Sequence, residues 1–161
     1  MGAHRRPSQT DWGLAMGLTT PYFAAQRLPP ALGTPLQARK FIRRTLGSWG
    51  GQITIPDVVA VANELVTNAV CHAFADITNG EDAWLGLSST SRSVLCAVTD
   101  PSPTPPRLLP STPLILRGRG LRVVDALSLS WGYTPLVDRP GKVVWAHVPS
   151  RSVSPRHDGP H

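Results

Sequence analysis

The most constraining feature of the sequence is an apolar run that carries three polar residues at intervals of four. Glu64, Asn68 and His72 recur at every fourth position, and on an α-helix this spacing places their side chains on one stripe. A carboxylate, an amide and an imidazole inside a buried helix must contact something polar, either other groups of the fold or a ligand. A largely buried helix over residues 56–74 is predicted because the positions around the stripe are apolar almost all round: Val58, Val59, Val61, Ala62, Leu65, Val66, Ala69 and Val70.

The length and the cysteine content narrow the class of protein. A chain of 161 residues suits one domain with a hydrophobic core. No apolar run reaches the length of a membrane span, and no apolar segment follows the first residues as it would in a signal peptide. Cys71 and Cys96 belong to no metal-ligand spacing. We therefore expect a cytoplasmic protein with two reduced thiols and no membrane contact.

The chain is basic, with a formal net charge of +6. Such a charge permits nucleic-acid contact. However, Arg5, Arg6, Arg151 and Arg156 lie near the two ends, and no aromatic residues alternate with the basic ones. A solvated basic surface is the favoured interpretation, with no direct nucleic-acid binding, and a nucleic-acid binder stays the weakest of the functional hypotheses.

The apolar patterns predict one domain over residues 21–149, between flexible tails at 1–20 and 150–161. Thr34 is the expected N-cap of a first helix that has Pro35 in its first turn. Further helices are predicted over residues 56–74 and 121–129, and strands over 22–28, 83–88, 93–99, 142–148 and from residue 131 onward. Because helices do not alternate with strands, we predict an α+β fold. Its form would be a two-layer α/β sandwich, with a mixed, mostly antiparallel sheet and helices on one face.

Two further local features accompany the polar stripe. Asp100 directly follows a continuous apolar strand, and Gly118 and Gly120 stand before a helix after a proline-rich loop. Each has a plain interpretation alone, as a strand cap or a flexible turn. Glycines at a helix start also leave backbone N–H groups free for phosphate. Asn68 offers an oxygen to Mg²⁺, and Glu64 is placed to accept a proton. Together these are the parts of an ATP site without a Walker-type loop.

Five segments resemble the GHKL (Bergerat-fold, histidine-kinase-like) ATPases. Within that superfamily the chain looks most like the small bacterial serine kinases that act as anti-sigma factors. The resemblance covers roughly residues 21–149, essentially the whole predicted domain. Its most specific part is the first of the matching segments: ELVTNAVCHA at 64–73, VTD at 98–100, GRGL at 118–121, WG at 131–132 and GKVVW at 141–145.

The resemblance implies a role for each matching residue. Glu64 corresponds to the catalytic base, Asn68 to the Mg²⁺ ligand and Asp100 to the aspartate that accepts a hydrogen bond from the adenine amino group. His72 corresponds to the histidine that ends the asparagine motif. The remaining matches belong to the lid over the ATP phosphates and the helix after it: Gly118, Arg119, Gly120 and Leu121. Arg119, together with Arg117, would either neutralise phosphate or lie on the lid surface.

The resemblance also implies partners. ATP and Mg²⁺ would be the cofactors, and the γ-phosphate would pass to a serine of an anti-anti-sigma protein with a STAS domain. The same protein would alternatively hold a sigma factor, and it would form a homodimer.

Two departures from the family pattern favour a second hypothesis, a binding module of the same fold that regulates by protein contact only. Prolines stand where the family often has glycines after the adenine aspartate, in DPSPT at 100–104. Val143 stands where many relatives have a hydroxyl residue beside that aspartate, and valine forms no side-chain hydrogen bond.

Overall fold

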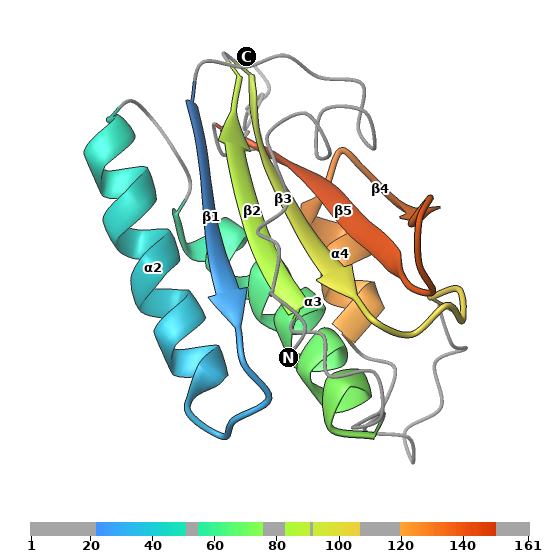
Figure 1. Ribbon diagram of the computed structural model, residues 1–161. Helices are drawn as coiled ribbons and strands as arrows, with labels where there is room; N and C mark the ends of the chain where they lie inside the picture. Colours follow the sequence, from blue (N-terminus) through green and yellow to red (C-terminus); the bar gives the residue numbers. More distant parts are fainter. Residues whose placement is uncertain (1–21, 51–54, 76–82, 91, 107–119, 151–161) are drawn as a thin grey trace, which may run out of the picture.

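One antiparallel sheet and a layer of helices make up the described part of the chain. The computed structural model describes residues 22–50, 55–75, 83–90, 92–106 and 120–150. The strands lie in the spatial order β1-β2-β3-β5-β4 (Figure 1). They are β1 (Tyr22–Leu28), β2 (Ala83–Ser89), β3 (Ser93–Asp100), β4 (Ser130–Pro135) and β5 (Lys142–Pro149). The helices among the described residues are α2 (Thr34–Trp49), α3 (Ile55–Ala75) and α4 (Gly120–Leu127).

The predicted α+β class and the predicted order of elements are confirmed. Every strand pair of the described sheet is antiparallel, so the parallel pairing of a mixed sheet is not found there. The predictions for the tails at 1–20 and 151–161, for the loop at 107–119 and for the turn at Asn79 and Gly80 fall outside the described residues.

The hydrophobic core lies between the sheet and the three helices. The helix α3 packs against α2, α4 and β3, and all eight apolar positions predicted to be buried in it are at most 9% exposed. Burying one valine or leucine side chain contributes about 2 kcal/mol to stability, so this helix is the main apolar surface of the second layer. The residues of the sheet that belong to the same hydrophobic cluster include Leu85, Leu87, Cys96, Val98, Val144 and Ala146.

The strand β3 is central in the sheet, as its continuous apolar run predicts. It is third of the five strands, and each of its side chains is buried. Successive side chains point to opposite faces. Cys96 and Val98 therefore belong to the core under the helices, whereas Ala97 packs on the other face with Val143.

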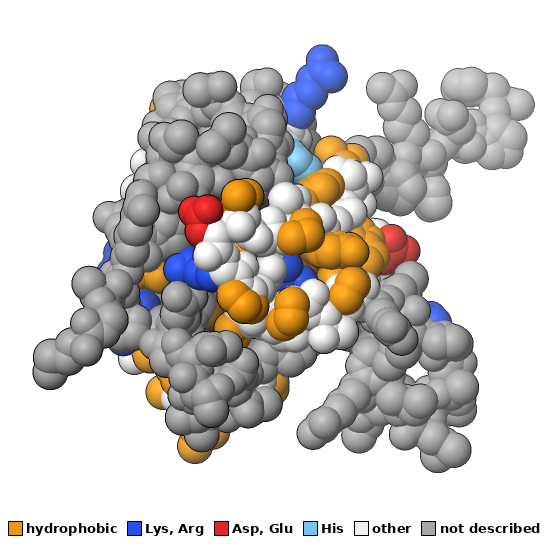
Figure 2. Space-filling model, turned by 45° about the vertical axis from the view of Figure 1, so that its right-hand side comes forward, with side chains coloured by type: hydrophobic (Ala, Val, Ile, Leu, Met, Phe, Trp, Pro, Cys, Tyr) orange, Lys and Arg blue, Asp and Glu red, His pale blue; other side chains and the backbone are white. Residues whose placement is uncertain are grey.

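The other face of the sheet carries a smaller apolar cluster around Ala97 and Val143. Trp84 and Trp145 pack against this pair. Gly132 lies across from Trp145 in the register of β4 and β5, and a Cβ at residue 132 would lie 2.9 Å from the indole. Glycine at this position therefore makes room for the ring. Figure 2 shows hydrophobic side chains spread over the side that it brings forward, with few charged ones between them.

The first helix differs from its prediction at its start. The N-cap is Gly33, not Thr34, and no side-chain hydrogen bond caps this helix. The hydroxyl of Thr34 donates instead to the carbonyl of Pro29. This hydrogen bond stabilises the turn between β1 and α2. Leu36, which fits the apolar period, is 52% exposed, because its position lies away from the side of the helix that is buried. That side consists of Thr34, Ala38, Phe41, Ile42, Thr45 and Leu46.

The turn before β5 is pressed against the end of β3. Gly141 has a positive φ of 125°, which L side chains rarely adopt. A Cβ there would lie 2.7 Å from the carbonyl oxygen of Asp100 and 3.0 Å from Leu136 Cδ1. Residue 141 therefore holds glycine both for its backbone angle and for this close contact.

We expect Gly141→Ala to lower the free energy of unfolding by about 2 kcal/mol or more, since a strained backbone and a steric overlap are both introduced. Gly47→Ala in α2 is the matched control. A Cβ at residue 47 would meet no atom within 4 Å, and alanine favours a helix by up to about 1 kcal/mol. Urea denaturation of the two variants measures both changes. Equal unfolding midpoints for Gly141→Ala and the original protein would contradict this explanation.

Candidate functional site

Glu64 and Asn68 of the polar stripe on α3 lie at the border of the buried face and not within it. Glu64 is partly buried and Asn68 is exposed, so the expectation of a buried acid and amide is wrong for Asn68. The reason is geometric. The apolar residues of α3 face the sheet, α2 and α4, and positions 64 and 68 fall just outside the sector that those elements cover. A residue on this border can meet a ligand without leaving the helix.

Partial burial changes the acid–base chemistry of Glu64. Desolvation raises the pKa of its carboxyl above the ordinary glutamate value, because burial disfavours the charged form. A carboxyl with a raised pKa is closer to the operating range of a general base than an exposed one.

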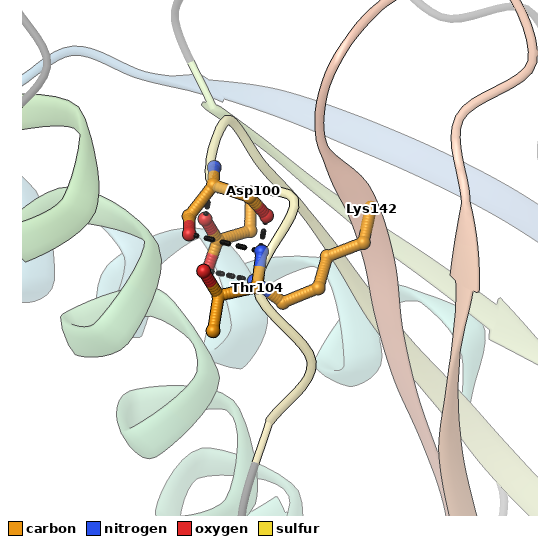
Figure 3. Close-up of polar contacts among 4 residues, drawn as sticks. Asp100, Thr104 and Lys142 are labelled. Carbon is orange, nitrogen blue, oxygen red and sulfur yellow. Dashed lines mark hydrogen bonds and ion pairs between the residues drawn. The ribbon is translucent and has the colours of Figure 1, made fainter.

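At the end of the central strand, Asp100 forms an ion pair with Lys142. The two residues lie directly across from each other in the register of β3 and β5. The Lys142 ammonium is 3.3 Å from Asp100 Oδ2, and the two side chains are 2% and 3% exposed. Figure 3 shows the two side chains converging beneath the loop that follows β3. A charged pair at this depth is tolerated because each member neutralises the other.

The loop after β3 closes over this pair through the backbone of Ser102. The Ser102 amide donates to Asp100 Oδ1 at 2.8 Å, and its carbonyl accepts from Lys142 Nζ at 2.8 Å. The Thr104 amide donates to Ser102 Oγ at 3.3 Å. The carboxylate therefore organises the chain that follows it, as aspartate does in turns, and the prolines around Ser102 restrict that loop further.

The residue that shares a face with Asp100 is Lys142, and not Val143. Val143 pairs with Thr99 and packs in the apolar cluster on the opposite face of the sheet. The missing hydroxyl at position 143 therefore says little about the surroundings of Asp100, and the interpretation of that departure is corrected. The sequence contains a usable signal for Lys142. An acid ends one predicted strand, a base begins another, and antiparallel pairing brings such ends together.

Of the other predicted site residues, three lie in described helices and two fall outside the described residues. Leu121 is buried in the first turn of α4 and Gly120 begins that helix, while His72 lies in the last turn of α3. Gly118 and Arg119 fall outside the described residues. In Figure 1 the carboxyl-terminal half of α3, the start of α4 and the Asp100 end of β3 lie at the same, lower end of the molecule. Three of the motifs therefore share one end of the fold.

Within the described residues, no three His, Cys, Asp or Glu side chains lie close enough together to form a metal site.

Neither thiol forms a disulfide: Cys71 is exposed on α3 and Cys96 is buried in β3. Burial raises the pKa of the Cys96 thiol to about 12. No described helix is long and apolar enough to cross a membrane.

No protein-family model matches the chain, and no curated protein matches it.

We expect Glu64→Gln to stabilise the protein at neutral pH and to leave its stability unchanged at low pH. Below the pKa of an unfolded glutamate, about 4, the carboxyl is neutral in both states. As the pH rises through the raised pKa of the folded state, the original protein must bury a charge, and the amide variant need not. Unfolding curves of both proteins at a series of pH values measure the difference. A difference that is constant with pH would contradict the desolvation of Glu64.

We also expect Asp100 and Lys142 to be strongly coupled. Asp100→Asn and Lys142→Met should each cost about 3 kcal/mol of unfolding free energy, since each leaves a buried charge without its partner. The double variant should cost less than the sum. Lys40→Met on the exposed side of α2 is the control and should change stability by less than about 0.5 kcal/mol. Simple additivity of the two single changes would show that the pair contributes nothing.

Proposed function

We propose that this protein is an ATP-binding regulatory protein of the anti-sigma factor type, with the Bergerat fold and serine-kinase activity. One observation carries the proposal. The helix with Glu64 and Asn68 packs against the central strand, and that strand ends in a buried carboxylate, Asp100. A helix and a strand packed in this way could hold both ends of a nucleotide without a Walker-type loop. The helix would supply groups for the phosphates, and the strand would supply a group for the adenine.

Each part of the nucleotide would have its own residues. Asp100 would accept a hydrogen bond from the adenine amino group. Gly118, Arg119, Gly120, Leu121 and His72 would lie on the phosphate side. Asn68 fits Mg²⁺ as a single neutral ligand, because this cation keeps several waters and takes other oxygens from phosphate. When bound, the cation would neutralise charge on the phosphate oxygens.

In the transfer step, Glu64 would take the proton of the attacking serine hydroxyl. The serine oxygen forms a bond to the γ-phosphorus as the bond to the ADP oxygen breaks. The raised pKa of Glu64 supports this role, because a base must hold the proton that it accepts. The acceptor would be a serine of a STAS-domain anti-anti-sigma protein.

The choice of partner would then depend on the nucleotide. With the serine acceptor absent, the same protein would hold a sigma factor and so regulate transcription without touching nucleic acid. We propose a cytoplasmic location from the sequence features described above, and a homodimer from the family resemblance.

A second function is favoured by the contacts of Asp100. Both of its carboxylate oxygens already have partners in the fold, Lys142 and the Ser102 amide. Under this alternative the protein binds ATP weakly or not at all and regulates by contact with its partners only. Asn68→Ala would then leave partner binding unchanged.

Calorimetric titration with ATP, with and without Mg²⁺, separates the two functions. We expect ATP to bind, and to bind more tightly when Mg²⁺ is present. Asn68→Ala should remove the gain in affinity that Mg²⁺ gives. The control Gln37→Ala, at an exposed amide on α2, should keep it. An absence of binding heat under both conditions would leave only the contact function.

Transfer of labelled γ-phosphate to purified STAS-domain proteins from the source organism tests the activity itself. We expect Glu64→Gln to bind ATP normally and to transfer phosphate at least about 100-fold more slowly, because general-base catalysis contributes a factor of this order. ATP binding without transfer to any of these proteins would retire the kinase assignment and keep the nucleotide site.

A further inference from the structure

We propose that Lys142 reads the nucleobase together with Asp100, and that the Ser102 backbone occupies the place of the base in the described conformation. This inference rests on the proposed function and specifies the adenine side of the same site. The carboxylate of Asp100 would accept from the exocyclic amino group of adenine. The ammonium of Lys142 would donate to ring nitrogen N1, the acceptor next to that amino group.

The sheet register fixes the two charged groups beside each other. Asp100 is the last residue of β3 and Lys142 is the first residue of β5, and the two are directly paired. Their side chains lie on the face of the sheet that α3 and α4 cover, since Val98 and Val144, the next pair on that face, belong to the core there. A ligand that reached Asp100 from this side would therefore meet Lys142 as well.

Among the described residues, the Lys142 ammonium has one N–H donor without an acceptor. An ammonium group carries three N–H donors. In the part of the chain that the structure describes, Lys142 Nζ makes two contacts, with Asp100 Oδ2 and with the Ser102 carbonyl oxygen. Its side chain is 2% exposed, so water cannot readily satisfy the third donor. A buried donor without a partner is unfavourable, and an acceptor on a ligand would relieve that cost.

The contacts of Ser102 have the same polarity as the reading edge of adenine. Its amide gives one donor to Asp100, and its carbonyl gives one acceptor to Lys142. Adenine presents a donor, the amino group, next to an acceptor, N1. Figure 3 shows the short loop between Asp100 and Thr104 beside the Asp100 carboxylate and the side chain of Lys142. The base would replace the hydrogen bonds that Ser102 makes to Asp100 and Lys142. Because both charged side chains are buried, the loop must move away before the base can bind.

Guanine would be discriminated against by the same pair. Its corresponding edge presents the carbonyl oxygen O6 where adenine has its amino group, and a ring N–H where adenine has N1. The carbonyl oxygen would face the Asp100 carboxylate, and the ring N–H would face the Lys142 ammonium. Two acceptors and two donors would then oppose each other, so the pair is a specificity determinant as well as a source of affinity.

The test compares ATP with 1-deaza-ATP, in which a C–H group replaces N1, by calorimetry on the full chain. We expect 1-deaza-ATP to bind roughly tenfold more weakly than ATP, as the loss of one charge-assisted hydrogen bond requires. The matched control is 7-deaza-ATP, which loses a ring nitrogen on the other side of the base and should bind like ATP. These measurements need no variant, so they do not depend on whether a changed residue 142 permits folding.

Lys142→Met provides the second arm. If Lys142 donates to N1, this variant should bind ATP and 1-deaza-ATP equally, and Lys40→Met should keep the original preference. Equal binding of both nucleotides by the original protein would overturn the role of Lys142 and leave the proposed ATP site standing. A preference for ATP that persists in Lys142→Met would assign the donor to another residue and also overturn it. No ATP binding at all would remove the proposed site and this inference together.

Discussion

The ion pair between Asp100 and Lys142 connects most of the features that position the candidate site. It joins the end of the central strand β3 to the start of β5, and the loop after β3 is folded onto it through the Ser102 backbone. The turn before β5 reaches the same point, where Gly141 packs against the Asp100 carbonyl. Two buried charges are costly to desolvate, so the arrangement persists only because strand register, loop and turn all hold the pair together.

The helix α3 meets two demands at once. Its apolar sector supplies much of the core, and its border carries Glu64 and Asn68 at the edge of that core. A helix fixed by packing on three neighbours is rigid, so the two polar side chains keep a constant spacing relative to the end of β3. Rigid support of this kind suits a site that must position a phosphate group, since small displacements weaken positional catalysis strongly.

Local patterns in the sequence predict most of the fold. The bounds of β1, the burial of α3 and the central place of β3 follow from apolar periodicity and flanking glycine and proline, which act over a few residues. The partner of Asp100 and the face taken by Val143 depend on the register between β3 and β5, strands separated by a long connection. The exposure of Asn68 depends on how far neighbouring helices cover α3. Register and coverage are tertiary properties, so the motifs identify candidate residues but not their contacts.

The two cysteines differ sharply in their surroundings. Their reactivity toward thiol reagents would therefore distinguish the native fold from an opened one. The thiol of Cys71 is exposed on the same helix as Asn68, while that of Cys96 lies in the central strand with its pKa raised to about 12. Thiolate is the reactive form. A maleimide dye would therefore attach to the helix surface of the native protein and reach the strand only when the sheet opens, so labelling stoichiometry would count closed and open molecules.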